Sequence, residues 1–244
     1  MLKLELVEAV LARALKGGAD FAEVYAQRAK KRRMKVRQGA LEEALSGLDY
    51  GAGVRLFFGT EVVYAYTNDL TQEGLMEALE TLLRAKGALG KVDEGGKGGL
   101  DFRKATPKGL HAPKVPYGEK DKRYRLERLL EAEAGARIAP AIKQVEASLL
   151  EWEEEVLVAN TEGVFAEEKR VRTRLFVLAV AQDGAEVQTG YSAPGKSVGL
   201  ELFDLYPPKA VGEKAARQAL TNLKARPAPA GTFPVVVGPG FGGV

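Results

Sequence analysis

Four stretches of the chain repeat apolar residues at intervals of three and four, the spacing that places them on one face of a helix. In the first stretch Leu4, Val7 and Leu11 form the apolar face, and Gly17-Gly18 supplies a C-terminal stop. The pattern predicts helices over about Lys3–Lys16, from Thr71 to Lys86, from Lys120 to a point before Pro140, and over Lys209–Ala225.

The segments between these helices have the alternating or short apolar runs of β-strands. Gln38-Gly39 and Asp183-Gly184 are typical of hairpin turns, and the basic run Lys30–Arg33 and the tripeptide Asp49–Gly51 are interpreted as further turns. The predicted strands are Phe21–Arg28, Arg33–Gln38, Leu41–Leu48, Gly51–Phe58, Glu61–Thr67, Ile142–Trp152, Glu155–Asn160, Val164–Gln182 and Ala185–Tyr191.

The same order of elements occurs twice along the chain. The interval from Gly59 to Gly184 equals the interval from Tyr66 to Tyr191, which indicates an internal duplication. Consecutive hairpins pair antiparallel, and helices at the ends of each repeat must cover one face of a sheet. The expected fold class is therefore α+β in two layers, with duplicated helix–antiparallel meander–helix units. The pattern leaves open whether the two sheets join.

The repeats suggest four parts. Residues 1–87 form the first unit and residues 120–227 the second. Residues 88–119 form a linker rich in glycine and proline, either functional or a surface excursion. Residues 228–244 contain an apolar strand and a glycine-rich turn. We interpret them as the start of a C-terminal catalytic domain that continues beyond this sequence.

Composition narrows the possible functions. The 244 residues include 36 Lys and Arg, 33 Asp and Glu, one His and no Cys, for a net charge of +3. The absence of cysteine fits a cytoplasmic protein, and the apolar pattern leads us to expect neither a signal peptide nor a membrane-spanning helix. A catalytic zinc usually needs three protein ligands, so one His, His111, makes a metal site within these residues improbable.

Two charged clusters have a structural and a functional interpretation. Arg28–Arg37 is expected to be a solvated sheet edge rather than a DNA site, because no aromatic residue within it could stack on bases. Glu151 and Glu153–Glu155 are expected to form a solvated hairpin turn rather than a metal or acid–base site. The loop Gly238–Gly243 follows a strand, but the helix and acidic residue of a dinucleotide site do not follow it.

Five motifs, in this order, resemble the N-terminal part of TldD/PmbA proteins, the "modulator of DNA gyrase" family. They are Gly18–Tyr25, Tyr50–Leu56, Thr67–Leu70, Asn160–Gly163 and Pro227–Val236. The resemblance covers nearly the whole chain and favours the TldD branch. In that branch a zinc-binding His-Glu-x-x-x-His helix follows a segment like Val235–Val244, and this motif is absent from the chain.

The resemblance implies a zinc metallopeptidase that acts on peptides and pairs with itself or a related subunit, without membrane or nucleic-acid contact. No catalytic or metal-binding residue of the family falls on this chain, and the substrate-binding residues are unknown. The chain alone is expected to bind no zinc and to be inactive. Its expected role is to enclose substrate and pair subunits. The alternative is a non-enzymatic module that works with a metal-bearing partner or modulates DNA gyrase.

Overall fold

The computed structural model describes residues 1–87, 100–105 and 112–238. The helices are α1 (Leu4–Lys16), α2 (Gln72–Ala85), η1 (Tyr117–Glu119), α3 (Lys122–Gly135), α4 (Leu202–Leu205) and α5 (Pro208–Asn222). The strands are β1 (Phe21–Arg37), β2 (Ala40–Phe58), β3 (Glu61–Thr67), β4 (Arg103–Ala105), β5 (Ile142–Asn160), β6 (Val164–Asp183), β7 (Glu186–Ser192) and β8 (Gly195–Lys196). The four long predicted helices are confirmed.

All described strands belong to one sheet, in the order β3-β2-β1-β5-β6-β4, with β7 and β8 also paired to β6. The pairing is antiparallel except between β4 and β6. Apart from the short elements β8 and α4, the helix–three strands–helix order occurs twice, so the expected α+β fold class is confirmed. The two units share a continuous sheet because β1 pairs with β5 from Glu23↔Asn160 to Arg37↔Glu146. The four-part division of the chain remains a prediction.

Three predicted breaks within strands are wrong. The chain runs straight through Lys30–Arg33 in β1, Asp49–Gly51 in β2 and the Trp152–Glu155 step in β5. Charged residues are common in turns, but here residues of opposite charge lie beside them on neighbouring strands. The strands are thus much longer than average. The hairpin turns at Gln38-Gly39 and Asp183-Gly184 are confirmed.

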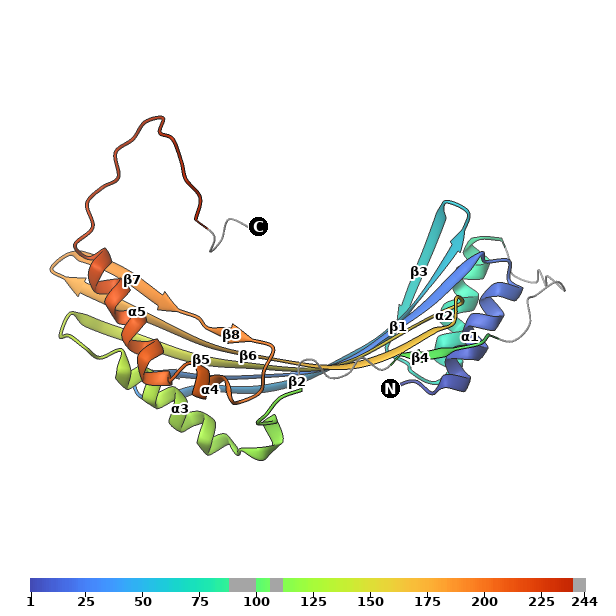
Figure 1. The fold of residues 1–244 in the computed structure, drawn as a ribbon, viewed down its shortest axis with the longest axis horizontal. Coiled ribbons are helices and arrows are strands. Elements are labelled where there is room, and N and C mark those ends of the chain that lie inside the picture. Colours follow the sequence, from blue (N-terminus) through green and yellow to red (C-terminus); the bar gives the residue numbers. More distant parts are fainter. Residues whose placement is uncertain (88–99, 106–111, 239–244) are drawn as a thin grey trace.

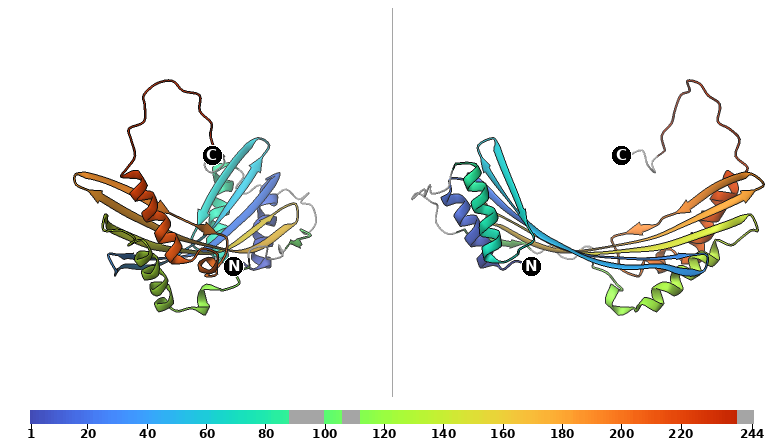
Figure 2. Two further views of the ribbon diagram at one scale, coloured as in Figure 1. Left: turned by 60° about the vertical axis from the view of Figure 1, so that its left-hand side comes forward. Right: turned by 180° about the vertical axis from the view of Figure 1, so that it is seen from behind.

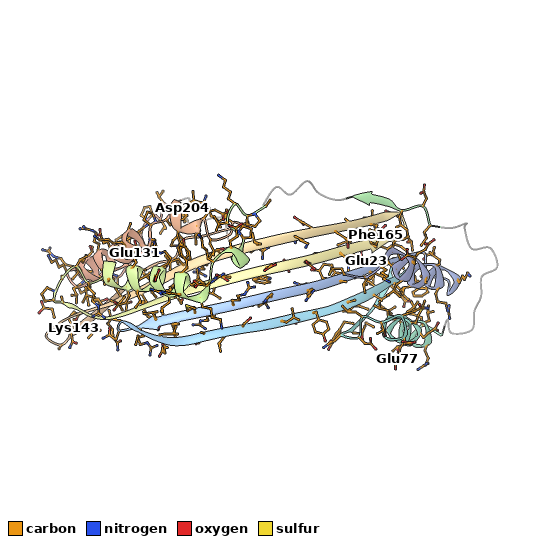
Figure 3. All side chains as sticks on the ribbon, turned by 90° about the horizontal axis from the view of Figure 1, so that it is seen from below. Glu23, Glu77, Glu131, Lys143, Phe165 and Asp204 are labelled. Atoms are coloured by element: carbon orange, nitrogen blue, oxygen red, sulfur yellow. The ribbon has the colours of Figure 1, made fainter. Side chains whose placement is uncertain are left out.

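Both helix pairs lie on the same face of the sheet. Even-numbered residues of β1 point to this face: Ala22 and Val24 pack in the core formed with α1 and α2, and Met34 and Val36 in the core formed with α3 and α5. Figure 3 shows the two helix pairs at opposite ends, with bare strands between them. We call this the helix face, the other side the open face, and the bare middle the waist.

The sheet is curved along its length, and its concave side is the open face (Figures 1 and 2). The described helices lie on the outer side of the curve. In the part of the chain that the structure describes, the waist therefore consists of strands without a covering layer of helices on either side. Among the described residues, no helix combines the length and apolarity needed to cross a bilayer.

The sequence analysis did not predict the short elements. Strand β4 lies in the segment expected to be a linker, where it pairs parallel with β6 at Val164–Ala166. Helix α4 also had no visible periodicity because it has a single turn. His111, most of the linker and residues 239–244 fall outside the described residues.

Candidate functional site on the concave face

The basic cluster Arg28–Arg37 lies in the waist, on a central strand. Its prediction as a sheet edge is wrong, because β1 has β2 on one side and β5 on the other. Acidic residues of these two strands neutralise much of its charge: Lys31 Nζ lies 3.5 Å from Asp49 Oδ2, and Lys35 Nζ lies 2.8 Å from Glu42 Oε2. Ion pairs between neighbouring strands thus take the place of an apolar layer.

The acidic cluster on β5 is not a solvated turn, and this prediction is also wrong. Glu151 is only 2% exposed and Glu154 6%. Glu151 forms a buried ion pair with Arg125 of α3, and its Oε2 lies 3.6 Å from Nη1 of Arg32. Glu154 lies on the opposite face, where it accepts a hydrogen bond from the amide of Gln27. Strand alternation sends successive carboxylates to different faces, so the four residues do not form one site.

The open face carries large apolar and aromatic side chains that remain exposed. They lie on β3 and β7, at the two ends of the face, and on β1, β2 and β5. Tyr66 is 76% exposed and Tyr64 56%. The other exposed members of this surface are Tyr25, Leu45, Val62, Leu150, Val187 and Tyr191. Exposed apolar and aromatic residues that gather at two ends of one face indicate candidate interaction sites.

A cleft of about 280 Å³ opens among the tyrosines of this face. Tyr25, Tyr64 and Tyr66 line it, over a floor that includes Gly51 and Gly53. A Cβ at Gly53 would lie 2.5 Å from Oη of Tyr64, so the ring can rest on the strand only because this residue is glycine. Glycine within a strand indicates such a close approach, and Gly51-Ala-Gly53 was the available sequence signal. We call this the tyrosine cleft.

Polar groups border the tyrosine cleft on the side of the waist. The pKa of Tyr25 is raised, first by burial and then by the Glu154 carboxylate, against the opposing effect of Arg170. Further along, Trp152 lies between two cations, with Lys31 Nζ 4.8 Å and the Arg172 guanidinium 5.4 Å from its ring. This face therefore offers aromatic surface, hydroxyl groups and cations, a combination suited to peptides.

The described residues do not fit a zinc centre. No three His, Cys, Asp or Glu side chains among them come together in a group that could hold a metal. His111 lies in a segment outside the described residues. We therefore derive no catalytic step through a metal from these side chains. The arrangement on the open face can bind and orient a ligand.

Two family models match the chain. The first, described as the PmbA/TldA metallopeptidase domain 1, matches residues 22–86. The second, described as the PmbA/TldA metallopeptidase central domain, matches residues 113–223. The two matched ranges correspond to the two repeated units of the fold.

Curated relatives agree with these models. A Metalloprotease TldD homolog from Haemophilus influenzae is 30% identical over 235 residues, which is 92% of this chain and 47% of the relative. A Metalloprotease from Methanothermobacter thermautotrophicus is 26% identical, over 92% of this chain and 48% of its own length. The chain thus spans about half the length of the curated relatives it matches.

Solved structures share the fold. A Thermotoga maritima protein described as a modulator of a DNA gyrase superimposes with a TM-score of 0.70 at 16% identity, over 93% of this chain and 50% of its own. TldE from Thermococcus kodakarensis gives a TM-score of 0.67 at 17% identity, over 88% of this chain and 47% of its own. At these identities the similarity is evidence for the fold alone.

Proposed function

Since this chain belongs to the PmbA/TldD family of metallopeptidases, we propose that it forms the substrate-enclosing and subunit-pairing part of a cytoplasmic zinc metallopeptidase that acts on peptides. The observation that carries the proposal is the concave open face, which presents exposed aromatic side chains and is covered by none of the described helices. A curved surface of this kind can form one wall of a chamber. Zinc and the catalytic residues belong to another part of the full protein.

The tyrosine cleft is the proposed contact for the peptide. Tyr64 and Tyr66 belong to β3, which pairs only with β2 among the described strands and so leaves one edge free. An extended peptide beside this edge gains main-chain hydrogen bonds, which are independent of its sequence. The tyrosine rings add apolar contact and hydroxyl groups. This combination favours broad specificity.

The far end of the open face is the proposed contact for a second family subunit. Leu150, Val187 and Tyr191 are exposed there, at a distance along the sheet from the tyrosine cleft. Apolar and aromatic residues of this type are common in the buried centre of subunit interfaces. The subunit can be a second copy or a related chain that supplies the metal.

The chain alone is expected to retain no stoichiometric zinc after dialysis and to cleave no peptide. Metal analysis and an assay with a fluorogenic peptide mixture test this directly. The same assay with the full-length gene product separates the two function classes. Zinc-dependent cleavage by the full-length protein supports the peptidase. Cleavage that needs an added metal-bearing subunit instead supports the non-enzymatic module, and one zinc per isolated chain contradicts the proposal.

The double substitution Tyr64→Ala and Tyr66→Ala is expected to weaken binding of fluorescent peptides to this chain about tenfold, because two aromatic contacts are lost. Fluorescence anisotropy measures the change. Leu48→Ala is the matched control: Leu48 is 52% exposed and lies on the helix face of the waist. Equal weakening by the control would show that the cleft has no special part in binding.

A further inference from the structure

A second cavity lies on the helix face, where α3 begins beside the waist. Its volume is about 500 Å³, which is within the usual range for small-molecule sites. It is formed between the middle of β1 and β2 and the segment from η1 to the start of α3 (Figure 3 shows this face). The tyrosine cleft opens on the opposite face of the sheet, so the two are separate. We call this the basic cavity.

Cations outnumber acids around the basic cavity. Five Lys and Arg residues line it from the helix face: Lys30, Arg32, Lys120, Lys122 and Arg125. Arg33 also borders it, but its side chain points to the open face, where Nε lies 3.4 Å from Oε1 of Glu43. Its acidic lining residues are Asp121 and Glu151, and both are already engaged. Asp121 Oδ1 accepts the N–H of Tyr124 at 2.8 Å as the N-cap of α3. Glu151 pairs with Arg125.

The arginine at the base of the cavity has a structural role. Nη1 of Arg125 donates to the carbonyl oxygens of Lys120 at 2.5 Å and Asp121 at 3.0 Å, and Nη2 donates to that of Tyr117 at 2.7 Å. These bonds and the Glu151 pair use its guanidinium fully. Arg125 therefore fixes the wall from which Lys120 and Lys122 extend.

Three lysines around the cavity have no carboxylate partner among the described residues, and one arginine nitrogen has no hydrogen-bond acceptor. Within the described part of the chain, Lys30, Lys120 and Lys122 form no ion pair with a carboxylate. Nη1 of Arg32 is buried without a hydrogen-bond partner there, although the Oε2 atoms of Glu151 and Glu153 each lie 3.6 Å away. The positive end of the α3 dipole adds to the same field. A bound anion would satisfy these groups.

The remaining wall of the cavity is apolar. Met34, Ala44 and Leu149 contribute to it. The ring of Tyr117 also lines the cavity, with the guanidinium of Arg32 5.6 Å from its centre. A ligand that matches both parts carries several negative charges at one end and an apolar or planar group at the other.

From this combination we propose that the basic cavity binds a small ligand with two or more phosphate groups, of nucleoside triphosphate size. The phosphates lie among Lys30, Lys120 and Lys122, since lysines bind phosphate as flexible point charges. The base or other planar group lies against Met34 and Leu149. This proposal concerns the opposite face from the peptide contact and does not depend on it.

Calorimetric titration of the 244-residue chain at about physiological salt tests the proposal, where exposed charges are already partly screened. The probes are ATP and inorganic tripolyphosphate. Both are expected to bind, with ATP tighter because it also contacts the apolar wall. The triple substitution Lys30→Gln, Lys120→Gln and Lys122→Gln is expected to weaken both at least about tenfold, since each exposed pair changes affinity only several-fold. All three lysines are exposed, so the fold tolerates the change.

The control carries the same charge change elsewhere: Lys209→Gln, Lys214→Gln and Lys224→Gln, three exposed lysines on or next to α5. It is expected to bind ATP like the unmodified chain. If both triple variants lose affinity for the probes equally, binding depends only on the net charge of the chain, and the proposed site is wrong. The absence of binding by either probe would contradict the proposal. Binding of a glutamate-rich peptide or an oligonucleotide, but not of the two small phosphates, would also overturn it.

Discussion

Replacement of Glu151 by alanine is expected to lower the free energy of unfolding by about 3–5 kcal/mol, the cost of removing one partner of a buried ion pair. The side chains of Glu151 and Arg125 are 1% and 8% exposed. Without the carboxylate, the Arg125 charge stays buried between α3 and the waist, and three carbonyl acceptors alone do not neutralise it. Urea denaturation followed by circular dichroism measures the loss.

An exposed pair on the same helix provides the control. Nε of Arg123 lies 3.0 Å from Oε1 of Glu127, and both side chains are largely in solvent. Glu127→Ala is therefore expected to cost less than about 0.5 kcal/mol. The double substitution Arg125→Met with Glu151→Leu is expected to recover most of the lost stability, because it removes both charges together. A single Glu151→Ala variant within about 1 kcal/mol of the unmodified chain contradicts this account.

Gly212→Ala is expected to destabilise the protein by about 2–3 kcal/mol through overpacking. The sign of this change in the free energy of unfolding is informative, because glycine-to-alanine changes within helices ordinarily stabilise a protein by roughly 0.5–1 kcal/mol. Gly212 lies where α5 crosses α3, and a Cβ there would be 2.0 Å from the carbonyl oxygen of Ala132. Since the obstacle is main chain, the two helices must separate. Thermal and urea denaturation both report the change.

Gly47→Ala is the corresponding control. Gly47 lies in β2 with an ordinary backbone conformation, and a Cβ there would meet no atom within 4 Å. The expected change is within about 0.5 kcal/mol. If Gly212→Ala stabilises the chain as a helix-propensity change would, the close crossing of α3 and α5 does not exist in solution.

The helices and tight turns were predictable because their causes are local. The three-four spacing of Leu75, Leu79 and Leu82 identifies α2 without knowledge of the rest of the chain. The turn at Asp183-Gly184 likewise depends on two residues. Such features follow from the backbone preferences of a few neighbouring amino acids.

The waist was not predictable because its causes are distant in sequence. The local sequence of Lys30–Arg33 predicts a turn, and only the acidic partners on β2 and β5 explain why it is a strand. Glu151 reads as solvated until Arg125 is placed beside it by α3. The tyrosine cleft had a local signal in the glycines at 51 and 53, but no local signal shows that Tyr25 and Tyr64 lie on either side of them. The basic cavity joins segments whose proximity only the fold provides.

The continuous sheet also has a consequence for how the chain reaches its native state. Each β-hairpin can form early from neighbouring residues, but the pairing of β1 with β5 brings together distant segments: the hydrogen-bonded side chains of Gln27 and Glu154 are 127 residues apart in sequence. Closing so long a loop costs chain entropy before any contact compensates it. During synthesis, the edge of β1 that pairs with β5 therefore stays unpaired until the second unit emerges. Slow refolding and chaperone dependence are the expected kinetic signature of this topology.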